Sequence, residues 1–544
     1  MKNRKFYLML LLGSLGIVDA LAQRPSVSAN KPRVVITADP ELDDNDTLIR
    51  AILYTTDFNV EGLVYQESTF HWKGDGKGTT QFRPAWGVAR AKTCPEGCTT
   101  YRWPFPEKEA FIDHIVDAYT KVYKNLKVHN PDYPDPALLK SKIKWGNVEF
   151  EGDFSKDTDG SNLIKSLLMD DKPGPLYVTA QGGQSTIARA LRSIYMECHD
   201  KPQWQSVREK ISHKLVIIPF GDQDGTYNSY IKPNWPDVAE WSLAMVEYGY
   251  GIRGSLSPEN MVYISGPWTR ENVLNRGPLG ALYRVWQDGV VMDPTDTFGF
   301  TADKLREMGR QAQEKDSFIS EGDTPTFLNL LNNGLRAQNG RWGGWGGIWR
   351  DGAGPMMNLI PIQGPLPPDD AGFAPGLAAQ GQKNPNIPDI ANAPAPQAGP
   401  QGMRRSPLPP EVLALNNRFF AASQNDFAAR LKWSVTPDFK DANHEPKVTV
   451  KGPLDLTAKA GSIVALQGTA SDPDHDSVKV KWWQYKDAGS YAGSVRIESP
   501  EALKTNIVIP ADAKVGDTIH LILEGTDSGT PALTQYQRVV ITAQ

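Results

Sequence analysis

Apolar and polar positions in the first half of the chain form blocks that predict strands, each followed by a helix. Apolar runs typical of buried strands occur at 34–36, 60–65, 176–179 and 215–220. The segments 47–53 and 186–194 have the spacing of helices. Because strands alternate with helices, the pattern predicts an α/β fold around a mostly parallel sheet.

After residue 446 the pattern changes to short alternating segments separated by turn residues. Strands are predicted at 447–450, 462–467, 478–485, 505–509, 520–524 and 537–542. Their number and spacing predict an antiparallel, immunoglobulin-like β-sandwich. We therefore expect an α/β domain at 33–444 and an all-β sandwich at 446–544.

Residues 352–410 differ in composition from the sequence on either side. The segment is rich in Pro, Gly, Ala, Gln and Asn and has little apolar periodicity. We interpret it as a flexible insertion. Helical spacing returns at 411–431, and this helix is expected to pack on the first domain.

The N-terminus has the features of a signal peptide. Basic residues precede the apolar run 6–18, and the small residues Ala20 and Ala22 follow it. This order predicts a cleavable signal peptide at 1–22 and a secreted or periplasmic protein; an uncleaved anchor is the alternative. Because no later run approaches the roughly 20 apolar residues of a membrane helix, we expect no stable membrane insertion.

The net charge and the cysteine content argue against a nucleic-acid-binding protein and against a disulfide-rich scaffold. The net charge is -5 and there is no long Lys/Arg run, so a nucleic-acid polymer is not an expected partner. Three cysteines are too few for a disulfide scaffold. Cys94 and Cys98 are close enough for one bridge, or they are two free thiols, and Cys198 is left over.

An acidic turn follows the first predicted strand. Residues 39–46 contain five acidic side chains, in Asp-Pro-Glu-Leu-Asp-Asp-Asn-Asp. This crowding is repulsive unless a cation or a helix N-terminus compensates it. Calcium, which takes six to eight oxygen ligands from flexible loops, meets this demand. In the alternative interpretation Asp43 or Asp44 caps the following helix and the other carboxylates are solvated.

The strand and its Asp-Pro-x-x-Asp-Asp turn resemble the N-terminal signature of the calcium-dependent nucleoside hydrolases. A closer resemblance is to a secreted family described as nucleoside hydrolase-like and cellulose-binding. It is carried by Val-Glu-Gly-Leu at 60–63, Gly-Gly-Gln-Ser-Thr-Ile-Ala at 182–188, Glu-Gly-Asp-Thr-Pro-Thr-Phe-Leu at 321–328 and Trp-Gly-Gly-Trp-Gly-Gly at 342–347. The resemblance covers about 33–444, and the C-terminal sandwich is similar to the domain that accompanies this family.

The resemblance implies a calcium site with an assigned set of ligands. Asp39 would be a metal ligand and the general base, and Asp44 a second ligand. Asp323 would complete the carboxylate set, and the backbone carbonyl of Ser185 would reach the metal.

The resemblance also implies a sugar site beside the metal. Asp43 would contact sugar hydroxyls, and Ser68 corresponds to a polar position near the bound sugar. Asn228 and Asn234 are candidates for the family's sugar-binding asparagine.

The sequence departs from the nucleoside hydrolase pattern at three positions. Thr37 stands where those enzymes usually have Asp, and Glu41 where they usually have Gly. Gly322 replaces the His that commonly precedes the last metal-binding Asp.

Aromatic residues near these motifs are further candidates for contacts with a ligand. Trp342 and Trp345 lie in a Gly-rich loop, where exposed rings would stack on sugars or bases. The alternative is that these rings pack on bare glycine backbone. His71 and Trp72 follow the second strand and would close over a leaving group, although a loop histidine is more often on the surface.

Taken together, these features predict a secreted, calcium-dependent hydrolase of N-glycosyl or related glycosyl bonds. A water activated by a metal-bound carboxylate would attack the anomeric carbon in one step, which inverts its configuration. The alternative is a non-catalytic protein that binds cellulose or another plant polysaccharide. In either case the expected partner is a sugar-containing small molecule or a polysaccharide.

Overall fold

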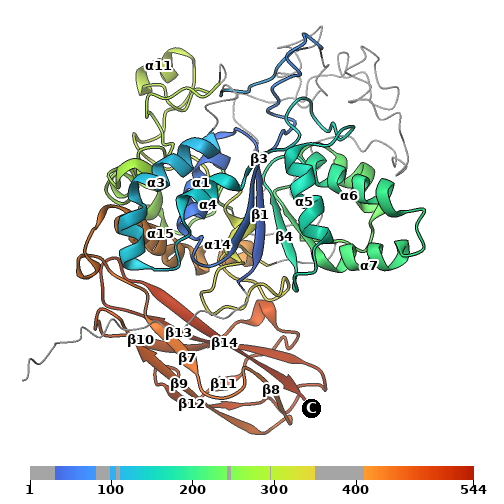
Figure 1. Cartoon of the computed structure of the whole chain (residues 1–544). Coiled ribbons are helices and arrows are strands. Elements are labelled where there is room, and N and C mark those ends of the chain that lie inside the picture. Colours follow the sequence, from blue (N-terminus) through green and yellow to red (C-terminus); the bar gives the residue numbers. More distant parts are fainter. Residues whose placement is uncertain (1–30, 81–97, 106–110, 242–246, 294–295, 349–409) are drawn as a thin grey trace, which may run out of the picture. The chain divides into compact units, whose positions relative to one another are not determined.

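A six-stranded sheet lies at the centre of the α/β part of the molecule (Figure 1). Its strands are β1 (Arg33–Ala38), β2 (Asn59–Tyr65), β3 (Ile143–Trp145), β4 (Leu176–Ala180), β5 (Leu215–Pro219) and β6 (Ala239–Glu240). Every neighbouring pair is parallel. The predicted α/β class with a parallel sheet is confirmed, and the short edge strands β3 and β6 are additions that no apolar run had indicated.

The central strand β1 is buried on both faces, as its unbroken run of β-branched residues requires. Successive side chains of a strand point to opposite faces. Val34 and Ile36 accordingly pack into one hydrophobic core, and Val35 packs into the other.

Helices cover both faces of the sheet (Figure 1). One core includes residues of α1 (Leu42–Leu53), α3 (Phe111–His129), α4 (Pro136–Ser141), α14 (Pro410–Arg418) and α15 (Phe420–Val435). The other includes residues of α5 (Asp159–Met169), α6 (Ser185–Cys198) and α7 (Trp204–Lys214). The helix expected at 411–431 is thus two helices, and both pack on the α/β part.

Short helices complete the α/β part. They are η1 (Tyr227–Ile231), α8 (Lys232–Asn234), η2 (Ile252–Gly254), η3 (Asn260–Ile264), α9 (Gly266–Thr269), η4 (Arg270–Leu274), α10 (Gly277–Gly280), α11 (Ala302–Glu307), α12 (Pro325–Leu328) and η5 (Phe439–Asp441). Among the described helices, none is long and apolar enough to span a membrane.

The strand order β3-β2-β1-β4-β5-β6 indicates where along the sheet a ligand would bind. From β1 the chain first builds one half of the sheet, with β2 beside β1 and β3 at the edge. It then returns to the other side of β1, where β4 is followed outward by β5 and β6. Ligands of open parallel sheets bind beyond the carboxyl ends of the strands where the order reverses. Here that point lies between β1 and β4, so the residues after Ala38 and after Ala180 face it.

The C-terminal part is a sandwich of two four-stranded sheets, in the orders β10-β13-β14-β8 and β11-β12-β9-β7. The strands are β7 (Lys447–Val450), β8 (Asp455–Ala458), β9 (Ile463–Ser471), β10 (Lys479–Gln484), β11 (Arg496–Ile497), β12 (Lys504–Val508), β13 (Thr518–Thr526) and β14 (Thr534–Ala543), with η6 (Lys486–Ala488) between β10 and β11. The all-β sandwich is confirmed. The prediction that it is antiparallel needs one correction, because β14 and β8 pair in parallel.

This computed structural model describes residues 31–80, 98–105, 111–241, 247–293, 296–348 and 410–544. The predicted signal peptide 1–22, the predicted insertion 352–410 apart from its last residue, and Cys94 lie outside the described residues. Cys98 is disulfide-bonded, and Cys198 is a free, buried thiol.

Candidate metal centre

The acidic turn lies at the carboxyl end of β1, where the backbone passes directly into a helix. Helix α1 begins at Leu42, with Glu41 at the N-cap and no side-chain cap. Asp43 and Asp44 therefore lie in the first helical turn, and neither is the cap that the alternative interpretation required. The backbone N–H of Asp39 donates to Asp44 Oδ1 at 3.0 Å, which fixes the two carboxylates relative to one another.

Four carboxylates meet at this end of the sheet and are shielded from solvent. Asp39, Asp43, Asp44 and Asp323 are each no more than 5% exposed. The Oδ1 atoms of Asp39, Asp43 and Asp323 have no hydrogen-bond partner. No Lys or Arg in the described ranges forms an ion pair with any of the four. Buried carboxylates without compensation are costly, and a hard, oxygen-seeking cation such as calcium would offset this cost. Asp323 is coupled electrostatically to Asp39 and Asp43, but it is in neither of the groups whose ligand atoms lie within 4.8 Å of one another.

The electrostatics of the cluster agree with this interpretation. Burial raises the pKa of Asp39 to about 7 and that of Asp43 to about 6. Burial, reinforced by the neighbouring carboxylates, raises the pKa of Asp44 and of Asp323 well above the usual range. A cation at this position would remove the repulsion and return the carboxyls to their ionised form.

One carboxylate oxygen of Asp39 accepts a hydrogen bond, and the other has no hydrogen-bond partner. Ser68 Oγ donates to Asp39 Oδ2 at 2.6 Å, and the backbone N–H groups of Phe70 and His71 donate to Ser68 Oγ. The loop after β2 therefore orients the Asp39 carboxylate, while its Oδ1 stays without a partner. The structure thus brings Ser68 to Asp39.

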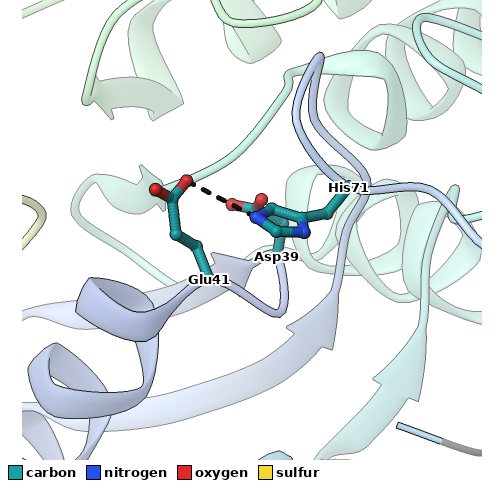
Figure 2. A group of neighbouring side chains, drawn as sticks. All are labelled: Asp39, Glu41 and His71. Atoms are coloured by element: carbon teal, nitrogen blue, oxygen red, sulfur yellow. Dashed lines mark ion pairs between the residues drawn. The ribbon is translucent and has the colours of Figure 1, made fainter. Parts of the chain in front are cut away.

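A histidine and a glutamate lie beside Asp39 at the rim of the cluster. His71 and Glu41 point toward one another, with 3.7 Å between His71 Nε2 and Glu41 Oε2 (Figure 2). Asp39, Glu41 and His71 each offer a ligand atom within 4.8 Å of the others, and so do Glu41, Asp43 and Asp44. His71 Nδ1 lies 2.6 Å from the carbonyl oxygen of Arg102, which assigns the proton to Nδ1 and directs Nε2 to the site.

Asp323 is positioned by a buried ion pair two residues before it. Arg50 of α1 donates from Nε to Glu321 Oε2 at 2.5 Å, and neither side chain is exposed. Tyr283 also donates to Glu321, at 2.5 Å. These contacts anchor the 321–323 segment against the helix that carries Asp43 and Asp44.

Two glycines allow the backbone to approach the carboxylates closely. A Cβ on Gly322 would lie 2.6 Å from Asp43 Oδ2, and a Cβ on Gly182 would lie 2.9 Å from Asp39 Oδ1. Both distances are shorter than packed atoms allow. Gly322 stands where the nucleoside hydrolase pattern usually has His, and the structure gives a physical reason: Asp43 occupies the space that a side chain at 322 would need.

Ser185 lies at the start of α6 and its contacts are with a second acidic pair. Its Oγ donates to Glu67 Oε1 at 2.6 Å, and its backbone N–H donates to Asp224 Oδ2 at 2.8 Å. The carbonyl of a first helical residue is directed along the helix toward the N–H four residues later. The Glu67–Asp224 pair thus fixes the Gly-Gly turn that faces Asp39.

Comparisons with known proteins are consistent with this geometry. Residues 33–349 match the family model described as cellulose-binding Sde182, nucleoside hydrolase-like domain, and 463–543 match that described as cellulose-binding protein Sde0182, C-terminal domain. The chain belongs to the Sde182 nucleoside hydrolase-like family. The resemblance predicted from the sequence motifs is confirmed.

A solved structure shares the fold of this Sde182 family member. It is described as a nucleoside hydrolase-related hypothetical protein from Saccharophagus degradans that is associated with carbohydrate metabolism. The two chains are 25% identical, the match covers 95% of this chain and 100% of that chain, and the TM-score is 0.61. No curated protein matches the chain.

The two asparagines proposed for sugar binding make local contacts in this Sde182 family member. Asn228 Nδ2 donates to Asp222 Oδ2 at 2.7 Å, and Asn234 Nδ2 donates to the carbonyl of Tyr230 at 2.8 Å. The first contact helps to hold the turn after β5, and the second lies within the short helical segment η1–α8. Neither of these contacts involves the four clustered carboxylates.

The tryptophans of the Gly-rich loop pack against the sandwich. Trp342 is half-buried, lies edge-on to His520 at 5.2 Å, and its carbonyl accepts from Arg538. Trp345 is only 3% exposed and lies edge-on to Tyr536. The prediction of an exposed platform is therefore wrong for Trp345, because its ring is enclosed; both rings follow the packing alternative.

Sequence reasoning did not assign Glu41 to the site and left His71 between two interpretations. Glu41 was counted in the acidic turn and named as a departure from the nucleoside hydrolase pattern. In the structure its carboxylate offers a ligand atom within 4.8 Å of those of Asp39 and Asp43. His71 is 4% exposed and not on the surface. The position of His71 after a parallel strand was the available signal, because such loops meet at one edge of the sheet.

Proposed function

We propose that this protein hydrolyses glycosyl bonds of sugar compounds, N-glycosyl bonds among them, with calcium held by Asp39, Asp44 and Asp323. The observation that carries the proposal is a buried set of carboxylates with unpartnered oxygens and, among the described residues, no Lys or Arg ion-pair partner. Hydrolysis requires a base with a free oxygen, such as Asp39 with its unpartnered Oδ1, whereas binding a polysaccharide does not.

Asp39 has the properties of a general base. Its Oδ2 is fixed by Ser68, and its buried Oδ1 has no hydrogen-bond partner, so Oδ1 is available to accept a proton. Asp39 Oδ1 would therefore take the proton of a water that attacks the anomeric carbon.

When bound, calcium would polarise that water and orient vicinal hydroxyls of the sugar. Asp43 would accept a hydrogen bond from a sugar hydroxyl, and the surrounding carboxylates would stabilise the positive charge that develops on the ring. Because the attack is a single displacement without a protein nucleophile, the configuration at the anomeric carbon would be inverted.

A second function is favoured by the family description, which names cellulose binding. In this alternative the hydrolase-like fold binds a polysaccharide and has lost catalysis. Both functions concern carbohydrate outside the cell, which is consistent with the predicted signal peptide and with secretion or export to the periplasm.

The two functions are separated by an assay of the purified mature protein. Nucleosides, aryl glycosides and cello-oligosaccharides are incubated with excess calcium or with a chelator, and products are quantified by chromatography. Calcium-dependent hydrolysis that falls more than a hundredfold in Asp39→Asn supports the proposal. Binding to insoluble cellulose without hydrolysis of any compound would instead establish the binding function.

A further inference from the structure

One aromatic side chain at the rim of the carboxylate cluster remains open to solvent. Tyr250 is 48% exposed, and its ring stacks on Phe298 with 5.5 Å between centroids and 19° between planes. Phe298 is in turn held edge-on by Trp286 at 5.1 Å. Because Phe298 covers one face of the Tyr250 ring, the exposed surface includes the opposite face.

Tyr250 is connected directly to the candidate metal centre. Its hydroxyl donates to Glu41 Oε1 at 3.4 Å. The preceding residue, Gly249, lies so close to the site that a Cβ on it would be 3.7 Å from the Cα of Gly322. The backbone N–H of Glu321 donates to the carbonyl of Tyr248 at 2.8 Å. These contacts fix the segment 248–250 beside the residues that position Asp323.

Described residues around Phe298, beneath Tyr250, are joined by hydrogen bonds and ion pairs. The segment that carries Phe298 folds back on itself, with the N–H of Gln287 donating to the carbonyl of Phe298 at 2.7 Å. Arg284 forms ion pairs with Asp288 and Asp296 inside this segment. An aromatic ring held on a fixed base loses little conformational freedom when it binds a ligand.

We propose that the open face of Tyr250 is a stacking platform for a neutral pyranose ring, adjacent to the sugar held at the carboxylate cluster. The C–H face of a sugar ring packs well on an aromatic face, and Glu41 beside it accepts hydrogen bonds from hydroxyls. The inference rests on the proposed function, because it adds a second subsite to the same crevice.

The charges around Tyr250 define the class of sugar. Glu41, Asp43 and Asp296 act electrostatically on the Tyr250 hydroxyl, so the surroundings of this side chain are acidic. Like charges repel, so uronic acids and phosphorylated sugars would be disfavoured. The ligand class is therefore a neutral oligosaccharide that is longer than one residue.

The test measures binding separately from hydrolysis. Cellobiose, cellopentaose, xylopentaose and a nucleoside are titrated by calorimetry into the full mature protein carrying Asp39→Asn, which removes the proposed base. Calcium is present in large excess, because this substitution also weakens the proposed metal site. Tyr250→Phe and Tyr250→Ala are compared in this background. The matched control is Tyr195→Ala, because Tyr195 also stacks on a ring, His199, but lies on α6.

We expect cellopentaose or xylopentaose to bind more tightly than cellobiose, with Tyr250→Ala weakening the pentaose about tenfold. Tyr250→Phe should stay within twofold to threefold, and Tyr195→Ala should have no effect. Calcium affinity, measured with Asp39 intact, should be the same with and without Tyr250→Ala, which separates the platform from the metal site.

The inference is overturned if Tyr250→Ala binds every pentaose as tightly as its parent, or if only nucleoside binding is lost. It is also overturned if the parent binds none of the neutral oligosaccharides. If the protein never hydrolyses these oligosaccharides but binds them in a Tyr250-dependent way, the proposed catalysis is refuted and the proposed stacking platform is still supported.

Discussion

Calcium affinity should fall steeply as the pH is lowered from 7 to 5. The folded-state pKa of Asp39 is raised by burial to about 7 and that of Asp43 to about 6, whereas an unfolded aspartate titrates near 3.8. Without metal, the protonated carboxyls stabilise the fold at low pH, and this stability is lost as the pH rises through 6 and 7. A bound cation requires the ionised forms, so protons and calcium compete.

The magnitude follows from these values. Each pH unit below the folded pKa costs about 1.4 kcal/mol for one carboxyl, or about tenfold in affinity. Because Asp39 is already half protonated at pH 7, it alone would weaken calcium about fivefold between pH 7 and 6. Asp39 and Asp43 together would weaken it about fiftyfold between pH 6 and 5. Asp44 and Asp323, whose pKa values are also raised, would steepen this dependence.

The assay is calorimetric titration of calcium at pH 5, 6, 7 and 8, in pairs of buffers that differ in ionisation enthalpy. The difference between the binding enthalpies measured in the two buffers of a pair gives the number of protons released when calcium binds. Ser68→Ala serves as a second probe, because it removes a hydrogen bond that lowers the pKa of Asp39. It should shift the fall in affinity to higher pH. An affinity that is constant from pH 5 to 8, with no proton release, would refute this reasoning.

Two further predictions concern the support of the site. Arg50→Met leaves the Glu321 carboxylate buried without its partner, so the free energy of unfolding in urea should fall by about 3–5 kcal/mol; a loss under about 1 kcal/mol would contradict the anchoring role. Gly322→Ala forces Asp43 to move, because the new Cβ would lie 2.6 Å from its Oδ2, and calcium affinity should fall at least tenfold. Gly254→Ala, whose Cβ would meet nothing within 4 Å, is the control, and equal losses in both variants would disprove the steric argument.

The fold was largely predictable because a strand that is buried on both faces of a parallel sheet appears in the sequence as a short run of apolar residues. Short apolar runs mark three of the strands, with Val-Val-Ile in β1, Leu-Tyr-Val in β4 and Leu-Val-Ile-Ile in β5. The edge strand β3, Ile143–Trp145, contains a lysine and is only half-buried, so no apolar run identifies it. The parallel pairing of β14 with β8 is a long-range contact, which local alternation cannot specify.

The site was predictable in part, for a similar reason. The crowding of Asp39, Asp43 and Asp44 is local, and the sequence displays it directly. The partnership of Glu321 with Arg50 and the approach of Gly322 to Asp43 depend on contacts between residues more than 250 positions apart. Tyr250 lies in a segment without periodicity, and its exposure beside Glu41 follows only from the folded structure.

The central claim is that the buried carboxylates form a calcium site. Its most direct test is calorimetric titration of calcium into the mature protein at pH 7.5, compared with Asp39→Asn and Asp44→Asn. Asp171→Asn, which changes a fully exposed carboxylate, is the control. The structure predicts a saturable binding step in the wild-type and Asp171→Asn proteins that is weakened more than a hundredfold in the other two variants. Unchanged calcium binding in Asp39→Asn and Asp44→Asn would contradict it.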